Sequence, residues 1–285
     1  MLKKLTQEEV ASAAERCWAL IQDPATRCYP IHECREDITR SFANSCNSES
    51  GTLLGYWAGD KLAGVCELFF EQEARYLRVT ALYAWDAPDA AQEAFLSHID
   101  DTFKGYEVNV GTPPENARLA AALARHGYAA GETCLDLRYD AVERTPEEAT
   151  IQGITLLEDE ADGGFEEYAP LHDAWFLNDY WSSARFRELQ GDWQAFTLRG
   201  KTGIEGSLIV LPGRNAAEVY ALHAESEQAA SALLMAMLWQ NETAEFGVNE
   251  IVFLAQSKNE VQLKAALDCG FTLFGRYTGW RKTIE

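Results

Sequence analysis

The sequence has no long apolar run, no paired cysteines and no catalytic serine turn, and each absence excludes a class of protein. No apolar run approaches the roughly 20 residues that a membrane helix needs, and the start, MLKKLTQEEV, lacks the apolar core of a signal peptide. The seven cysteines include no Cys-x-x-Cys pair, which favours reduced thiols over disulfides or a zinc site. A Gly-x-Ser-x-Gly turn, the signature of many serine hydrolases, is also missing. We therefore expect a cytoplasmic protein with no metal and no membrane partner.

Basic residues are scarce as well. The 285 residues include 24 Lys and Arg against 45 Asp and Glu, which gives a formal net charge of −21. Such a charge repels nucleic-acid phosphates and anionic membranes, so neither is expected as a partner. An acidic surface serves solubility by itself, and it favours a small cationic ligand over an anionic one. The oligomeric state does not follow from it.

The length favours two domains, and an internal repeat indicates that they are copies of one another. NARLAAALARHGY at 116–128 is matched by NEVQLKAALDCGF at 259–271, 143 positions downstream. Asn, Gly and an aromatic residue occupy the same places in both. Asn and Gly cap any short helix, so one such segment alone would carry little information.

Further matches extend the repeat in both directions along the chain. Predicted strands flank the helix on the same offset, and a Gly-containing hairpin lies 52 or 53 residues upstream of the helix Asn. The aligned pairs are Val108 with Ile251, Val110 with Phe253, Leu137 with Trp280, Arg138 with Arg281, Leu62 with Ile204, and Gly64 with Gly206. Their common order makes tandem duplication a better explanation than chance.

Each half predicts the same order of elements: a strand, two helices, three strands, a helix, a strand, a helix and two strands. Strands and helices mixed in this way predict an α/β fold, an α+β mixed sheet with helices on its faces. The charged segment 141–150, broken by Pro146, predicts the boundary between the halves. The predicted domains are 1–143 and 150–285.

This layout resembles the GNAT acyltransferase superfamily, and the resemblance covers nearly the whole chain as two copies. In that family a hairpin with a Gly-containing turn precedes a central strand, and GDKLAGV at 59–65 matches it. A later helix has the form Asn-x₁₀-Gly-Phe/Tyr, which is matched by Asn116 to Gly127 and by Asn259 to Gly270. The resemblance implies two tandem GNAT-like acyl-CoA N-acyltransferase domains.

The resemblance also implies acetyl-CoA as co-substrate. In the family two neighbouring strands part, and the pantetheine amides add to them like another strand, while the pyrophosphate meets the next helix N-terminus. The family's turn at that helix is rich in glycine, but the first-half turn at 86–95 has none. It carries Asp86 and Asp89, of which one or the other is interpreted as the helix cap. We infer that the domain at 1–143 has lost ordinary coenzyme A binding and is structural.

The second-half turn at 225–234 lacks glycine too, but its small side chains leave room for an anion. Gln228 fits the first place of the family's turn in one register and Ala230 fits the last place in another, and both registers remain open. Glu225 and Glu227 count against phosphate binding. In this domain the residues assigned to the cofactor are Leu222, Ala224, Gln228, Ala229, Ala230 and Asn259.

Acetyl transfer to an amine needs a base for the ammonium proton and an acid for the leaving thiolate. The family's usual acid, a Tyr seven residues after the helix Asn, is missing, because those positions are Leu123 and Ala266. Each substitute also has a purely structural interpretation, as a sheet aromatic or a hydrogen-bonded residue. The catalytic candidates are Glu218, His223 and Tyr277, with Glu67 as a further base and Tyr220 as a further acid.

The stretch HDAWFLNDYW at 172–181 interleaves aromatic and acidic residues where the family shapes its acceptor pocket. Asp173, Asp179 and Trp181 are the candidates to receive a cation by charge and by an aromatic face. The alternative is a helix end with Trp175 in the core.

The predicted function is transfer of an acetyl group from acetyl-CoA to the primary amine of a small cationic acceptor. Two alternatives stay open, namely a catalytically inactive module that binds a ligand or a protein, and an enzyme that uses another acyl carrier. The missing glycines and the missing tyrosines favour the first of these alternatives.

Overall fold

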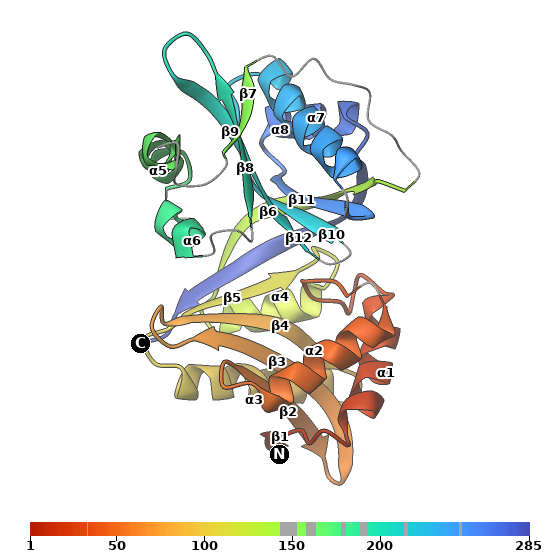
Figure 1. Cartoon of the computed structure of the whole chain (residues 1–285). Coiled ribbons are helices and arrows are strands. Elements are labelled where there is room, and N and C mark those ends of the chain that lie inside the picture. The colour runs from red at the N-terminus through yellow and green to blue at the C-terminus, as the bar shows by residue number, and fades with distance from the viewer. Residues whose placement is uncertain are drawn as a thin grey trace. The chain divides into compact units, whose positions relative to one another are not determined.

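The computed structural model describes residues 1–32, 34–142, 153–157, 164–177, 181–188, 193–213, 216–244 and 247–285. They form two compact units. Unit 1 comprises Met1–Thr133 with Arg276–Glu285, and unit 2 comprises Cys134–Gly275. Each unit is a mixed sheet with helices on it, so the predicted α/β fold with a mixed sheet is confirmed (Figure 1).

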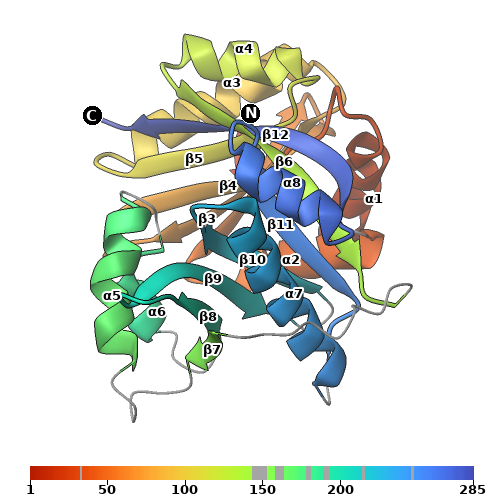
Figure 2. The same ribbon diagram turned by 90° about the horizontal axis from the view of Figure 1, so that it is seen from above.

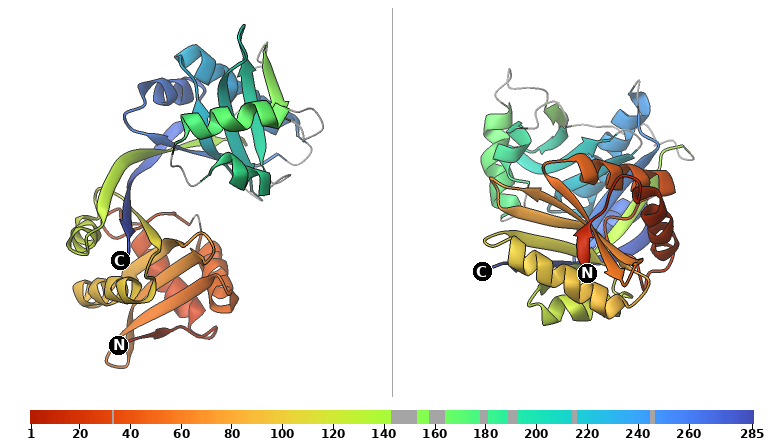
Figure 3. Two further views of the ribbon diagram at one scale, coloured as in Figure 1. Left: turned by 90° about the vertical axis from the view of Figure 1, so that its left-hand side faces the viewer. Right: turned by 90° about the horizontal axis from the view of Figure 1, so that it is seen from below.

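Unit 1 has a six-stranded sheet in the order β1-β2-β3-β4-β5-β12. β4 and β5 are parallel neighbours, and the other neighbours are antiparallel. Helices α1 and α2 lie on one face and α3 and α4 on the other, as Figure 3 shows. The elements are β1 (Leu2–Lys4), α1 (Val10–Ile21), α2 (Arg35–Asn47), β2 (Gly51–Ala58), β3 (Lys61–Glu71), β4 (Tyr76–Ala84), α3 (Pro88–Thr102), β5 (Glu107–Thr112), α4 (Ala117–Arg125) and the end of β12 (Thr272–Thr283).

Unit 2 repeats this plan in the order β6-β11-β10-β9-β8-β7. Helices α7 and α8 pack side by side on one face of the sheet, and α5 and α6 lie on the other (Figure 2). Each face has its own apolar core, one under α7 and α8 and one under α5 and α6. The elements are the end of β6 (Ala129–Asp140), β7 (Ile154–Leu157), α5 (Gly164–Trp175), α6 (Ser183–Glu188), β8 (Gln194–Arg199), β9 (Ile204–Pro212), β10 (Ala216–His223), α7 (Glu227–Thr243), β11 (Glu250–Gln256) and α8 (Glu260–Asp268).

The two units exchange their last strands. β6 follows α4 in the chain but pairs with β11 of unit 2, with Leu137 opposite Phe253. β12 follows α8 but pairs with β5 of unit 1, with Trp280 opposite Val110. Each half therefore ends in one described strand, where the sequence predicted two. The predicted domains differ from the compact units in the assignment of 134–143 and 276–285.

The repeated helix α4 and helix α8 are capped in the same way. The side chain of Asn116 accepts the N–H of Leu119 at 3.1 Å, and that of Asn259 accepts the N–H of Gln262 at 3.1 Å. Both helices end at a glycine of positive φ, 79° at Gly127 and 97° in the second copy. This confirms the predicted caps, since glycine adopts that conformation without a Cβ clash.

The predicted cap of α3 is wrong. Its N-cap is Ala87, in the left-handed conformation at φ 49°, and no side chain caps the helix. Pro88 fills the first helical position, where its missing N–H costs nothing. Asp89 instead lies 3.6 Å from Arg118 of α4.

Candidate active site in unit 2

The parallel strands β10 and β11 part halfway along their length. They pair from Ala216 opposite Glu250 to Val219 opposite Phe253, and no later pair is formed although both strands continue. At the same point the register between β10 and β9 shifts across Tyr220, which is a β-bulge. A bulge bends a strand and increases its twist, which accounts for the divergence. Beyond Val219 the backbone of β10 therefore forms no ladder pair with β11.

Unit 1 has the same feature at the equivalent place. β4 and β5 pair only as far as Val79 opposite Val110, and the register between β3 and β4 shifts across Thr80. The divergence is therefore a property of the repeat. The two units differ in what meets the unpaired backbone.

In unit 1 a loop of the same chain, at Cys28 and Tyr29, lies between the parted strands β4 and β5. The N–H of Leu82 on β4 donates to Sγ of Cys28 at 3.2 Å, and the N–H of Tyr29 donates to the carbonyl of Gly111 on β5 at 2.9 Å. The side-chain amide of Asn116 holds the preceding carbonyl of Arg27 at 2.9 Å. Cys28 is 1% exposed, and burial raises the pKa of its thiol to about 11, so the sulfur is a packed, neutral group.

In unit 2 a side chain meets the equivalent backbone. The carbonyl of Leu222, beyond the last pair with β11, accepts a hydrogen bond from the side-chain amide of Gln262 on α8. Leu222 is buried in the core under α7 and α8, and Ala224 follows the end of the strand, half-buried. These two residues were predicted to bind the cofactor, and both lie along the parted edge.

Helix α7 begins directly after this edge. Ser226 is its N-cap and accepts the N–H of Ala229 at 3.2 Å. Gln228 is exposed in the first turn, whereas Ala230 is fully buried and its N–H bonds the carbonyl of Ser226 at 3.0 Å. Of the three positions predicted to meet phosphate, only Gln228 offers an N–H that is free among the described residues.

The first-turn acid of α7 is neutralised by a base on α8. The ammonium of Lys264 lies 2.6 and 2.7 Å from the two carboxylate oxygens of Glu227. This pair raises the pKa of Lys264, and the pair is at the surface. The repulsion that Glu227 would exert on a phosphate is thereby reduced.

Asn259, also predicted to bind the cofactor, caps α8 through its side-chain oxygen. Its side-chain nitrogen has no partner among the described residues, unlike that of Asn116, which is bound to Arg27. Within the part of the chain that the structure describes, the amide donors of Asn259 are therefore available to a ligand.

The other face of β10 carries the predicted bases. Ala217 and Val219 pack under α7 and α8, so Glu218 lies on the α5 and α6 face by the alternation of a strand. Tyr220 packs on the same face, with its ring 5.0 Å from that of Trp181.

His223 closes this face at the end of β10. Its ring stacks on Trp175 with centroids 4.1 Å apart and planes 9° from parallel. Partial burial lowers the pKa of His223, which outweighs the opposing effect of Glu225. His223 is therefore neutral at pH 7, with a lone pair able to accept a proton.

The predicted acceptor residues connect α5 to α6. Asp173 accepts the N–H and the hydroxyl of Ser183 at 2.8 and 2.7 Å, which holds the start of α6. Burial opposes ionisation of Asp173, but the hydrogen bonds from Ser183 prevail and its pKa is lowered. The carbonyl of Trp181 lies 2.7 Å from Nε2 of the buried His172. Asp179 lies outside the described residues.

Two further candidates lie in unit 1. Tyr277 belongs to that unit, where its ring packs 4.8 Å from the ring of Tyr29. It is not among the residues that the structure brings together in unit 2. Glu67 is 1% exposed and accepts hydroxyl groups from Ser41, Ser45 and Thr80 at 2.8, 2.7 and 2.7 Å.

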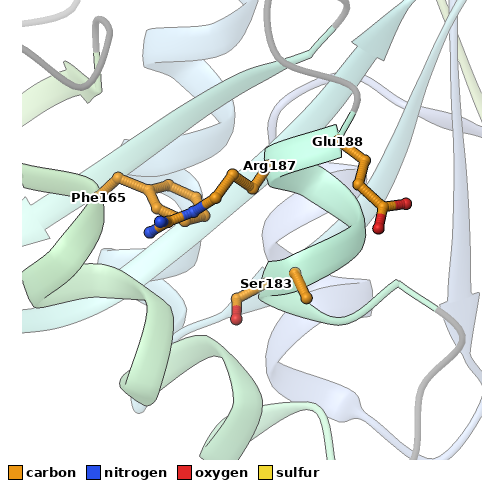
Figure 4. Close-up of a pocket in the computed structure, with 5 residues that line it drawn as sticks. Phe165, Ser183, Arg187 and Glu188 are labelled. Atoms are coloured by element: carbon orange, nitrogen blue, oxygen red, sulfur yellow. The ribbon is translucent and has the colours of Figure 1, made fainter.

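An open pocket of about 460 Å³ lies at α5 and α6, lined by Phe165, Ser183, Ala184, Arg187 and Glu188. Figure 4 shows Arg187 lying across Phe165, with Glu188 directed to the other side of the helix. Arg187 is bound to Glu166 at 2.5 Å, so its charge is already paired. Glu188 has no partner among the described residues. No group of three or more His, Cys, Asp and Glu able to hold a metal is present in the described part of the chain.

Comparison with known proteins identifies this architecture. No family model and no curated protein matches the sequence. Among solved structures, a GCN5-related N-acetyltransferase from Sphaerobacter thermophilus is similar over 100% of this chain and 96% of its own, at 13% identity and a TM-score of 0.70. The chain has the tandem GNAT fold.

Two other solved structures agree. A tandem GNAT protein from the clavulanic acid biosynthesis pathway matches 99% of this chain and 98% of its own, with 15% identity and a TM-score of 0.59. An acetyltransferase described as putative, from Pyrococcus horikoshii, matches 99% of this chain and 88% of its own, with 14% identity and a TM-score of 0.58. The resemblance drawn from the two Asn-to-Gly helices is thus confirmed for the fold. Within the described residues, no helix is long and apolar enough to cross a membrane.

Sequence reasoning missed Gln262, Lys264 and Trp175 as parts of this site. Gln262 stands three residues after the N-cap, a spacing that predicts a bond back to the cap itself. Its side chain instead reaches the carbonyl of Leu222. No local pattern marks such a contact, because its partners are 40 residues apart in the chain.

Proposed function

We propose that the chain is an N-acetyltransferase that binds acetyl-CoA at the parted strands of unit 2 and acetylates the primary amine of a small cationic acceptor. The observation that carries this is the divergence of β10 from β11 beyond Val219 and Phe253. Parted strands offer unpaired backbone groups, and the pantetheine amides of acetyl-CoA are able to pair with them as an added strand. Leu222, Ala224 and Asn259 are the residues we assign to that contact.

We favour unit 2 over unit 1 as the acetyl-CoA site because the partner that now meets its parted backbone edge can be replaced by a ligand. In unit 1 main-chain and sulfur atoms of Cys28 and Tyr29 occupy the edge. In unit 2 the side chain of Gln262 meets it at the carbonyl of Leu222. We therefore expect one acetyl-CoA per chain.

The phosphates would lie at the start of α7, where the N–H groups of Glu227 and Gln228 are not bound by Ser226. A helix N-terminus of this kind favours anions. Lys264, paired with Glu227, reduces the repulsion that this carboxylate would exert on a phosphate. Gln228 is the second residue after the N-cap of α7, and the second residue after the N-cap of α3 is Asp89. The negative charge of Asp89 disfavours phosphate binding in unit 1.

The chemistry needs few groups. After the base has taken the ammonium proton, the amine nitrogen attacks the thioester carbonyl carbon, a C–N bond forms and the C–S bond breaks. The thiolate takes a proton from an acid, and the second proton released by the new amide nitrogen restores that acid. His223 is our first candidate for the base that takes the ammonium proton, because its pKa is lowered and its ring is held by Trp175. Glu218 on the same strand is the second. Tyr220, at the bulge, is the acid candidate within unit 2, and Tyr277 remains a prediction.

The cationic nature of the acceptor rests on charge. Unit 2 holds 24 of the 45 acidic residues and 9 of the 24 basic ones, a formal charge of −15 against −6 for unit 1. We assign the cation to Trp181, whose ring lies near Tyr220, and to Glu188, which lines the pocket and has no partner within the described part of the chain. Asp173 is hydrogen-bonded to Ser183, so we expect it to attract the acceptor through its negative charge and not by direct contact.

Isothermal titration calorimetry of the full chain with acetyl-CoA tests the proposal. We expect micromolar binding at one site, weakened about tenfold, or about 1.4 kcal/mol, by Gln228→Asp, which places the unit 1 residue at the start of α7. Asp89→Gln, the reverse change at the matching position of α3, is the control and should leave binding unchanged. No binding to the wild-type chain would favour the inactive binding module instead.

A further inference from the structure

Gln262 stands at the point where a strand-like ligand would pair with unit 2. Its side-chain nitrogen donates to the carbonyl of Leu222, which lies on β10 past the last pair with β11. Leu222 is 2% exposed, so its carbonyl is poorly placed to find water. A buried carbonyl without a partner is destabilising. Gln262 therefore satisfies a backbone group that the fold leaves bare.

The side chain of Gln262 can leave this carbonyl without disturbing its helix. The backbone N–H of Gln262 is held by the side chain of Asn259 at 3.1 Å, and this cap does not involve the Gln262 amide. Gln262 is half-buried, so its side chain has solvent within reach. Rotation about its side-chain bonds is thus enough to release Leu222.

The equivalent position in unit 1 shows the contrast. Three residues after the helix Asn stands Leu119, which is fully buried and has no donor. The parted edge of β4 is met instead by Cys28, whose neighbours are bound to Asn116 and Gly111. Freeing that edge would require a main-chain segment to move, whereas unit 2 requires the movement of one side chain.

We propose that Gln262 is a displaceable plug that competes with the pantetheine arm for the carbonyl of Leu222, an inference that rests on the proposed function. In the free chain Gln262 supplies one N–H to this carbonyl. On binding, a pantetheine amide supplies the N–H instead, so that the carbonyl stays satisfied throughout. A ligand that has phosphates but no pantetheine amide cannot donate an N–H to the carbonyl of Leu222, so the Gln262 side chain stays bound there.

The test compares two ligands by calorimetry on the full chain. Acetyl-CoA carries the pantetheine amides as well as the nucleotide phosphates, whereas adenosine 3′,5′-bisphosphate carries the adenosine and phosphate groups but no pantetheine amide. Gln262→Ala removes the competitor and should tighten acetyl-CoA binding about tenfold while leaving binding of the bisphosphate within twofold. Gln262→Met keeps the length of the side chain but not its donor, and it should tighten acetyl-CoA binding in the same direction. Gln240→Ala, on α7 and outside the site, is the matched control and should change neither affinity.

The outcomes separate the plug from the proposed function. Weaker or unchanged binding of acetyl-CoA to Gln262→Ala, with binding intact in the wild type, overturns the plug and leaves the proposed function standing. Equal tightening for both ligands also overturns it, because a general loosening of α8 would act on both. Failure of the wild type and of both Gln262 variants to bind acetyl-CoA refutes the proposed function and the plug with it. Thermal unfolding of each variant confirms that the comparison is made on folded chains.

Discussion

The exchange of strands predicts that a mutation near the end of the second repeat loosens the first unit. Ile284 is 2% exposed in the core of unit 1, and its N–H bonds the carbonyl of Tyr106 at 3.0 Å. Leu137 belongs to the first repeat in sequence, yet it is 1% exposed in the core of unit 2. Ile284→Ala should therefore loosen unit 1, and Leu137→Ala should loosen unit 2.

The size of the effect follows from burial. Truncating a buried Ile or Leu to Ala costs about 2–5 kcal/mol, because apolar contacts are lost and a cavity remains. A cost of about 3 kcal/mol raises the opening equilibrium of the affected unit roughly 100-fold. Leu273→Ala is the control, since Leu273 lies on β12 but is 57% exposed, and it should change stability by no more than about 0.5 kcal/mol.

Hydrogen exchange of the full-length chain, resolved by peptide, reports the opening of each unit separately. Ile284→Ala should accelerate exchange in β2 to β5 and leave β8 to β11 protected, and Leu137→Ala should do the reverse. If Ile284→Ala loosened β8 to β11 while β2 to β5 stayed protected, the assignment of the C-terminal segment Arg276–Glu285 to unit 1 would be refuted.

Three further predictions concern charge in unit 2. Trp175→Ala should move the pKa of His223 up toward its ordinary 6.5, because the stacked ring contributes to the burial that lowers it; an NMR titration of the imidazole without an upward shift would contradict this. As the pH falls below 6.5, His223 is protonated in the unfolded chain before it is protonated in the folded chain. The free energy of unfolding should therefore be unaffected by His223 above pH 6.5 and should decrease below it. Affinity for acetyl-CoA should increase with moderate added salt, which screens the repulsion between an anionic ligand and a unit of charge −15; calorimetry showing a decrease would mean that basic contacts dominate. Asp173→Ala should destabilise the start of α6 by about 1 kcal/mol, seen as faster amide exchange there. The wild type should lose the same protection as the pH falls below 3.8 toward the lowered pKa of Asp173, and unchanged exchange in both cases would show that Asp173 does not hold α6.

Local signals predicted much of the repeated framework. The caps at Asn116 and Asn259 depend on residues within one turn, so their spacing alone specified them. The offset of 143 residues also placed Leu137 and Trp280 at equivalent positions. Both residues indeed stand opposite equivalent partners, Phe253 and Val110.

The same equivalence explains why the exchange of strands could not be predicted. If β6 and β12 derive from one ancestral strand, each has an alternating pattern that fits the edge of either unit. The choice of partner is then decided by connections and by contacts far apart in sequence, such as Ile284 with Tyr106. A repeat found in the sequence specifies which strands are alike, not which of them pair.

The occupants of the two parted edges were equally beyond prediction. Cys28 reaches Leu82 across 54 residues, and Gln262 reaches Leu222 across 40. Neither residue stands in a pattern that marks it. The interpretation of Asp86 or Asp89 as the cap of α3 failed for a related reason, because Pro88 and the left-handed Ala87 begin that helix without any side-chain cap.

The strand exchange gives the first repeat a direct part in the proposed site. Beyond Val219 and Phe253, β11 loses its partner on the side of β10. Over that same stretch its other edge stays paired with β6, from Leu254 opposite Asp136 to Gln256 opposite Cys134. β6 comes from the first repeat, so the repeat whose own parted edge is filled by Cys28 also supplies the strand that holds β11 in place. A chain that lost its first repeat would lose this support, which is a physical reason for the first repeat to persist without binding acetyl-CoA itself.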